Sequence, residues 1–106
     1  MNTANILTDL PPKQHEEFLE TLVENGNIRI ERIASHGHTS PEGFWYDQES
    51  NEWVMVVQGS ARIEFKDGRS EAFLSPGGYV FLPAHCKHRV VWTDENTIWL
   101  AVHWPV

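Results

Sequence analysis

The spacing of apolar residues changes near residue 27 of this chain. Within residues 13–24 the apolar side chains recur at the spacing of one helix face: Phe18, Leu19, Leu22 and Val23. A proline lies just before this segment and Asn25-Gly26 follows it, which is typical of a helix start and a helix end. The pattern predicts one short amphipathic helix. Because so short a helix is unstable alone, its apolar stripe should pack on the rest of the protein or on a second subunit.

From residue 28 onward, short apolar runs are separated by turn residues, as in β-proteins. Ile28 and Ile30 alternate with Arg29 and Glu31, as on a half-buried strand, while Ile33 is out of phase, which indicates a bulge or bend. Asp67-Gly68 is a strong hairpin signal. The runs are 28–33, 44–46, 53–58, 61–65, 69–74, 79–82, 88–93 and 97–104. About eight short strands without an intervening helix predict an antiparallel barrel or sandwich. We therefore expect one domain, with residues 1–27 as an N-terminal segment carrying the helix and residues 28–106 as the barrel.

The last predicted strand, residues 97–104, is apolar on both faces. Trp99, Ala101 and His103 share one face, and Leu100 and Trp104 lie on the other. An apolar outer face on a small barrel is usually covered by a partner. The apolar outer face of this strand therefore predicts that the protein is a homodimer.

Composition and charge restrict the kinds of partner. The 106 residues include 8 Lys plus Arg and 15 Asp plus Glu, for a formal charge of −7, so we expect no binding to nucleic acid or to anionic membranes. The sequence predicts neither a signal peptide nor a membrane span. The single Cys86 cannot form an internal disulfide, which fits a reducing compartment. A cytoplasmic protein is the expectation.

Two spaced motifs resemble those of the cupin family. Glu52 is followed by six residues and Gly59, like the second half of the first cupin motif. Gly77 is followed by five residues, Pro83, four residues and His88, which is the spacing of the second motif. The resemblance implies a cupin-type jelly-roll barrel in which this Glu and this His bind a metal. His85 stands where the family usually has Gly.

The first half of the first motif differs from the family pattern. The family usually has His-x-His shortly before the Glu, and here Tyr46 and Gln48 take those two places. The chain does contain His36-Gly-His38, but 13 residues separate His38 from Glu52, outside the usual spacing. Residues two apart on a strand point to the same face, so Tyr46 and Gln48 should face the barrel interior together.

We predict a divalent transition metal held by Glu52, His88 and Gln48. Glu oxygen and His nitrogen suit Fe, Mn, Ni, Zn or Cu, and a cation would offset the cost of burying these groups in an apolar barrel. The alternative is a hydrogen-bonded Glu52–His88 pair in a barrel without metal, with Gln48 as a polar core residue.

Tyr46 and His36 are the candidates for an acid or base, and several other residues have open roles. Tyr46 could also be a metal ligand or a core aromatic. If the metal has further nitrogen ligands, the candidates are His36 or His38 folding inward, His85 and His103. Otherwise His36 and His38 could be solvent-exposed loop residues, His85 could only cap a strand, and His103 could line the pocket. Cys86 is interpreted as packing.

Three functions follow from this site. The first is a metal-dependent enzyme acting on a small organic molecule, and the second is a non-catalytic module that binds or senses a small, sugar-like molecule without metal. The third is a dimeric structural protein with a vestigial pocket. The fold itself does not choose among them, and whether the protein is an enzyme stays open.

Overall fold

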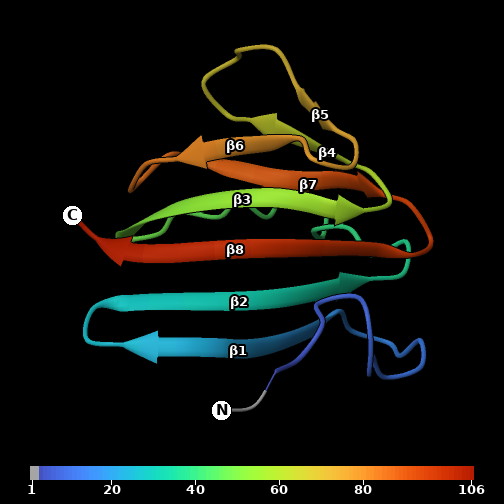
Figure 1. Cartoon of the computed structure of the whole chain (residues 1–106). Coiled ribbons are helices and arrows are strands. Elements are labelled where there is room, and N and C mark those ends of the chain that lie inside the picture. Colours follow the sequence, from blue (N-terminus) through green and yellow to red (C-terminus); the bar gives the residue numbers. More distant parts are fainter. Residues whose placement is uncertain (1–2) are drawn as a thin grey trace.

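The computed structural model describes residues 3–106 and forms two antiparallel β-sheets that face each other (Figure 1). The strands are β1 (Phe18–Asn25), β2 (Ile28–Ser35), β3 (Ser50–Gln58), β4 (Ala61–Phe65), β5 (Ala72–Leu74), β6 (Tyr79–Leu82), β7 (His88–Thr93) and β8 (Thr97–Pro105). One sheet has the order β1-β2-β8-β3-β6 and the other the order β5-β4-β7. The prediction of an all-β antiparallel fold is confirmed.

The prediction of an N-terminal helix is wrong. Residues Phe18–Asn25 form β1, which pairs with β2 from Phe18↔Ala34 to Asn25↔Ile28. A register shift between Thr21 and Val23 moves the strand from one face to the other. The apolar residues that have a helical spacing in the sequence are therefore divided between the two faces of the sheet. No helix that could cross a membrane occurs in the described part of the chain.

The core lies between the two sheets and is built from the inward residues of both. Its buried members are Val54, Val56, Ala61, Ile63, Phe65, Leu74, Leu82, Trp99 and Ala101. Residues from β3 and β8 of the large sheet meet residues from β4 and β5 of the small sheet. Alternation along each strand places their neighbours on the outer faces.

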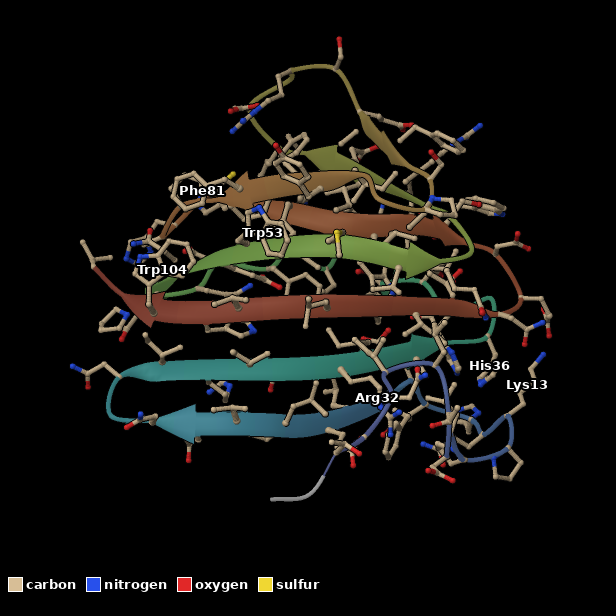
Figure 2. The ribbon with its side chains drawn as sticks, viewed as in Figure 1. Lys13, Arg32, His36, Trp53, Phe81 and Trp104 are labelled. Carbon is tan, nitrogen blue, oxygen red and sulfur yellow. The ribbon has the colours of Figure 1, made fainter. Side chains whose placement is uncertain are left out.

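The N-terminal segment crosses one end of the outer face of the large sheet. It is held there by Arg32 of β2, which is buried although it lies on that face (Figure 2). The Arg32 guanidinium donates hydrogen bonds to the carbonyl oxygens of Ile6 and Thr8, and it pairs with Glu20 of β1. These bonds satisfy a buried charge and fix the segment on the sheet.

Candidate functional site

A cavity of about 350 Å³ lies inside the barrel between the two sheets. Its walls are apolar where Ile63, Val54 and Trp99 line it. Its polar lining residues are Glu17, Arg29, Glu31, Tyr46, Gln48, Glu52, His88 and His103. A cavity of this size with a few polar groups in an apolar wall is typical of a small-molecule site.

The register of the large sheet places three of these polar groups side by side. Arg29 of β2 pairs with His103 of β8, and His103 pairs with Glu52 of β3. Glu52 and His103 are each only 8% exposed. Glu31 follows two residues after Arg29 and therefore shares its face. The sheet thus directs two carboxylates and one imidazole toward the same interior.

His103 bridges the two carboxylates. Its Nε2 lies 2.9 Å from Glu31 Oε1 and 3.9 Å from Glu52 Oε2. Because the carboxylate oxygen accepts, Nε2–H is the donor, and a neutral His103 then has its lone pair on Nδ1. That Nδ1 atom is buried and has no hydrogen-bond partner. His103 therefore presents an unused polar atom inside the protein.

Gln48 and Glu52 are also joined directly. Gln48 Nε2 donates a hydrogen bond of 2.9 Å to Glu52 Oε1. The Gln48 carbonyl oxygen accepts a hydrogen bond of 2.7 Å from the backbone N–H of His85. Gln48 is thereby fixed beside Glu52, as expected for two groups of one site.

His88, at the start of β7, lies against Tyr46. The two residues exchange backbone hydrogen bonds of 2.7 and 3.2 Å, and their rings stack with centroids 5.2 Å apart. His88 Nδ1–H donates to the carbonyl oxygen of Cys86 at 2.8 Å. This bond fixes the neutral tautomer in which Nε2 keeps its lone pair, as in most metal-binding histidines.

Burial raises the pKa of the Tyr46 phenol, and the carboxylates of Glu17 and Glu52 raise it further. A hydrogen bond with the Ser40 hydroxyl acts in the opposite direction. Tyr46 therefore stays protonated at neutral pH. It can donate a hydrogen bond to a ligand in the cavity, but it is not a base.

A short hydrogen-bonded chain fixes the remaining carboxylate, Glu17. Trp99 Nε1–H donates to Ser35 Oγ at 3.1 Å, and Ser35 Oγ–H donates to Glu17 Oε2 at 2.8 Å. Ser35 is fully buried at the end of β2, and Glu17 directly precedes β1. The chain orients Glu17 at the wall of the cavity.

The comparisons with known proteins agree with this architecture. The model of the family described as "Cupin domain" matches residues 29–103. The chain belongs to the cupin family. A crystal structure from Ralstonia eutropha JMP134, described as a "putative mannose-6-phosphate isomerase", is 46% identical to this cupin, with a TM-score of 0.93 and 99% of each chain covered.

More distant structures share the fold alone. A cupin superfamily protein from Desulfitobacterium hafniense DCB-2 is 15% identical, with a TM-score of 0.75 over 92% of this chain and 84% of that chain. KdgF from Halomonas sp. is 19% identical, with a TM-score of 0.76 over 97% of this chain and 93% of that chain. No curated protein matches the chain.

In this cupin, the metal candidates Glu52, His88 and Gln48 all line the cavity, as does the acid candidate Tyr46. The sequence therefore named four residues that share one site. Among residues 3–106, however, no group of three or more His, Cys, Asp or Glu side chains stands close enough to hold a metal ion. His103, which the sequence left open, joins the site through Glu31 and Glu52.

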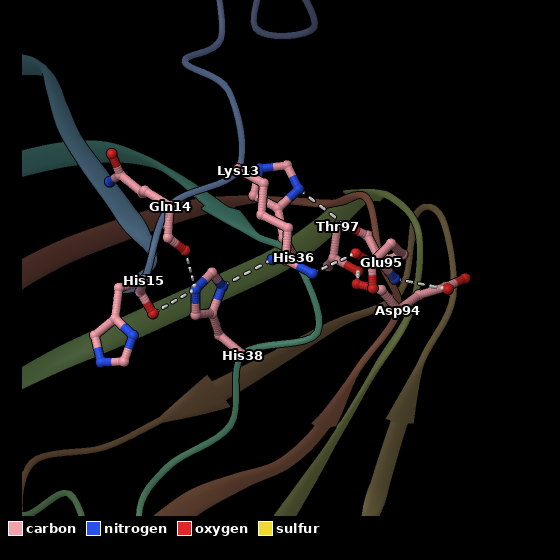
Figure 3. Close-up of polar contacts among 8 residues, drawn as sticks. All are labelled: Lys13, Gln14, His15, His36, His38, Asp94, Glu95 and Thr97. Atoms are coloured by element: carbon pink, nitrogen blue, oxygen red, sulfur yellow. Dashed lines mark hydrogen bonds and ion pairs between the residues drawn. The ribbon is translucent and has the colours of Figure 1, made fainter.

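His36 does not line the cavity, so the structure does not support its predicted role as an acid or base there. It follows the end of β2, and its Nδ1–H donates to the Glu95 carbonyl oxygen at 3.0 Å (Figure 3). His38 Nδ1 accepts the backbone N–H of His36, and its Nε2–H donates to the carbonyl oxygens of Gln14 and His15. His36 thus joins the loop after β2 to the turn between β7 and β8, and His38 joins the same loop to the N-terminal segment.

His85 and Cys86 also lie outside the lining of the cavity. His85 is exposed, has a φ of 62°, and lies 2.8 Å from Asp47. This left-handed backbone explains why other cupins favour Gly at the position. Cys86 packs against the core, which confirms its interpretation as a packing residue.

Glu17 and Glu31 were not identified from the sequence. Ile28 and Ile30 suggested that their side of β2 faces the core, which would put Arg29 and Glu31 in solvent. The register shows the reverse, because Arg29 and Glu31 share the face of His103 and Ala101. Ile33 could have indicated the inward position of Glu31, because these two residues lie on the same face of β2 and Ile33 is out of phase with Ile28 and Ile30.

Proposed function

We propose that this cupin binds a small polar organic molecule in the barrel cavity, beside a divalent transition metal held by Glu52 and His88. The observation that supports the proposal is the convergence of ionisable and amide side chains on one cavity in an apolar barrel. Buried ionisable groups are costly unless they are paired or serve a ligand, and they gather at functional sites.

The donor set fits a divalent metal. His88 offers Nε2 with its lone pair, and Glu52 offers a carboxylate. Gln48, whose Nε2 donates to that carboxylate at 2.9 Å, would offer its amide oxygen as a third, neutral ligand. Imidazole and carboxylate suit Fe, Mn, Ni, Zn or Cu. When bound, such an ion supplies Lewis acidity to an oxygen of the ligand.

The other side chains would bind and orient the molecule. Tyr46, with its raised pKa, donates a hydrogen bond from the phenol. Glu31 and His103, 2.9 Å apart, hold a proton between the carboxylate and Nε2. These groups can serve a binding protein, and they can serve an enzyme by donating a proton.

The second candidate is a binding module without metal. Gln48, Glu52, His103 and Glu31 already interact with one another through contacts of 2.9, 3.9 and 2.9 Å. Such a network neutralises part of its own burial cost without an ion. In this case the ligand would contact the polar side chains directly.

The experiment that separates the two candidates is elemental analysis of protein purified without chelator or metal-affinity resin. The proposal expects about one equivalent of a divalent transition metal in the parent and a strong loss in Glu52→Gln and His88→Ala. If the folded parent holds no transition metal, even after incubation with Mn²⁺ or Zn²⁺, the metal site is contradicted and the binding module without metal is the remaining candidate.

We also propose a cytoplasmic location. It is supported by the lone Cys86, which is half-buried and has no cysteine partner. Proteins of oxidising compartments more often carry paired cysteines.

A further inference from the structure

The charges that line the cavity restrict the class of ligand. Glu17, Glu31 and Glu52 contribute three carboxylates, and Arg29 contributes the one guanidinium. With neutral histidines, these lining residues carry a formal charge of −2, and no lysine is among them. The net charge of the cavity lining is therefore negative, and it repels anions.

The one cation of the lining is already engaged. Arg29 Nε lies 3.1 Å from Glu31 Oε2, and the Arg29 side chain is 44% exposed at the rim. The Glu31 carboxylate offsets the formal charge of this guanidinium, so the pair adds no net positive charge to the cavity. Glu17 and Glu52 remain without a cationic partner among the lining residues.

We propose that the ligand is an uncharged, hydroxyl-bearing molecule of about the size of a monosaccharide, and that its phosphorylated form is excluded; this rests on the proposed function. A divalent ion beside Glu52 and His88 would bring the formal charge of the lining to zero. In neither state is there surplus positive charge for a phosphate dianion, whereas carboxylates accept hydrogen bonds from hydroxyl groups.

A second observation also points to a hydroxyl donor. His103 is 8% exposed, and its Nδ1 is buried without a hydrogen-bond partner. In the neutral tautomer set by Glu31, Nδ1 can only accept a hydrogen bond. A ligand hydroxyl can donate to this atom once the imidazole ring shifts to expose it, so the atom favours a hydroxyl-bearing ligand, while the charge of the lining discriminates against the phosphate.

The test is calorimetric titration of the parent with mannose and with mannose 6-phosphate, each with and without Mn²⁺. Without Mn²⁺, mannose should bind at least about tenfold more tightly, because the added dianion faces uncompensated carboxylates; with Mn²⁺ the preference should be smaller but keep its sign, because the lining then has no surplus positive charge. Glu31→Gln and Glu17→Gln should reduce this preference. Glu71→Gln, which makes the same charge change on an exposed loop outside the cavity, should leave it unchanged.

The outcomes separate this inference from the proposed function. Equal or tighter binding of mannose 6-phosphate would overturn the inference and leave the small-molecule site standing. If neither sugar binds in either state, the inference falls; if, in addition, no metal binds to the parent, the proposed function falls too.

A different part of the molecule carries a second proposal. The outer face of the large sheet presents apolar side chains across all five of its strands. One row follows the strand pairings from edge to edge: Val23, Ile30, Val102, Trp53 and Phe81. Figure 2 shows Trp53, Phe81 and Trp104 gathered at one end of this face, where the rings of Phe81 and Trp104 stack at 5.8 Å.

This apolar face is open to solvent and carries no charge in that row. Phe81 is 49% exposed, and its neighbour on the same face, Tyr79, is 63% exposed. The N-terminal segment covers only the end of the face near Arg32. A contiguous apolar patch of this kind marks an interaction surface.

We propose that a second copy of this chain covers the face. Each chain has a formal charge of −7, so two copies approach most easily through a surface poor in unpaired carboxylates, and Glu20, which lies on this face, is paired with Arg32. The five strands have 8, 8, 9, 9 and 4 residues and lie about 4.8 Å apart, so the face measures roughly 600 Å² in projection, including the end under the N-terminal segment. Because protruding side chains make the accessible surface larger than the projected area, this face approaches the approximately 800 Å² that each partner of a stable complex buries.

Light scattering coupled to size-exclusion chromatography tests this proposal. The parent should have twice the 12.2 kDa mass of the chain, and Phe81→Glu should reduce it to one chain. Phe73→Glu is the matched control, because Phe73 is 60% exposed but lies on β5 of the other sheet. Circular dichroism checks folding, and Tyr79→Glu replaces Phe81→Glu if that variant unfolds.

A parent of 12.2 kDa at high micromolar concentration would overturn the proposal. So would a dimer that survives both Phe81→Glu and Tyr79→Glu, or one that Phe73→Glu dissociates.

Discussion

Replacing Gly59 with Ala should destabilise the barrel much more than the same change at Gly68. Gly59 connects β3 to β4 with a φ of +81°, and Gly68 lies in the turn between β4 and β5 with a φ of +86°. The backbone cost of a side chain is therefore the same at both positions, about 1–2 kcal/mol. Only the surroundings of the two residues differ.

A Cβ atom at Gly59 would lie 2.6 Å from Thr97 Oγ1, 2.7 Å from the Asn96 carbonyl oxygen and 2.8 Å from Thr97 Cα. Thr97 cannot move easily, since it is 1% exposed and its hydroxyl lies within hydrogen-bond distance of the carbonyl oxygens of Ser60 and Asp94. Relieving such overlaps costs about 1–3 kcal/mol. At Gly68 a Cβ meets nothing within 4 Å.

The free energy of unfolding should therefore fall by about 2–5 kcal/mol in Gly59→Ala and by about 1–2 kcal/mol in Gly68→Ala. Guanidinium titration followed by tryptophan fluorescence measures both values, and the m-values should match the parent. Equal losses in the two variants would refute the reasoning, because the crowding at Thr97 would then contribute nothing.

Three further predictions concern the site. Because the pKa of Tyr46 is raised, its contribution to stability is complete below pH 10.0, the ordinary pKa, and is lost as the pH rises through the higher pKa of the folded state. The tyrosinate absorbance of the parent minus that of Tyr46→Phe should therefore show a transition above pH 10.0. In Glu52→Gln, which removes one of the carboxylates that raise this pKa, the transition should move to lower pH. Ser35→Ala should cost about 1–3 kcal/mol in urea titration, because Trp99 Nε1–H loses its acceptor, and no loss would contradict the hydrogen-bonded chain to Glu17. Removing metal with a chelator should lower the Tm of the parent and leave the Tm of Glu52→Gln unchanged. For a metal held at 100 times its Kd, the lost stability is about 2.7 kcal/mol.

Most strands after residue 27 could be predicted because alternation and turn residues are local signals. The β4–β5 hairpin at Asp67-Gly68 is an example, where Gly68 N–H donates to the Phe65 carbonyl oxygen. The prediction of a strand at 44–46 is wrong, since only Tyr46 there forms an isolated bridge, with His88. Glu52 and His88 could be predicted from motif spacing, which fixes where each residue enters the barrel. These features do not depend on how distant strands pair.

The features that were missed depend on such pairing. β1 was mistaken for a helix because its bulge near Leu22 shifts the apolar residues from one face to the other. Arg29 and Glu31 were not recognised as cavity residues because Ile28 and Ile30, with which they alternate, make the outer face of β2 apolar. His36 was placed in the cavity although its ring bonds to the Glu95 carbonyl oxygen, and no local pattern indicates that contact.

The most direct test of the central claim is a long-range ¹H–¹⁵N spectrum of the histidine side chains during titration with Zn²⁺. The proposed site requires the metal at Nε2 of His88, because Nδ1–H is held by the Cys86 carbonyl oxygen at 2.8 Å. One Nε2 signal, absent from the spectrum of His88→Ala, should shift and saturate at about one equivalent. A shift confined to the exposed His85 or to His36 and His38, or no shift at all, would contradict a metal site in the cavity.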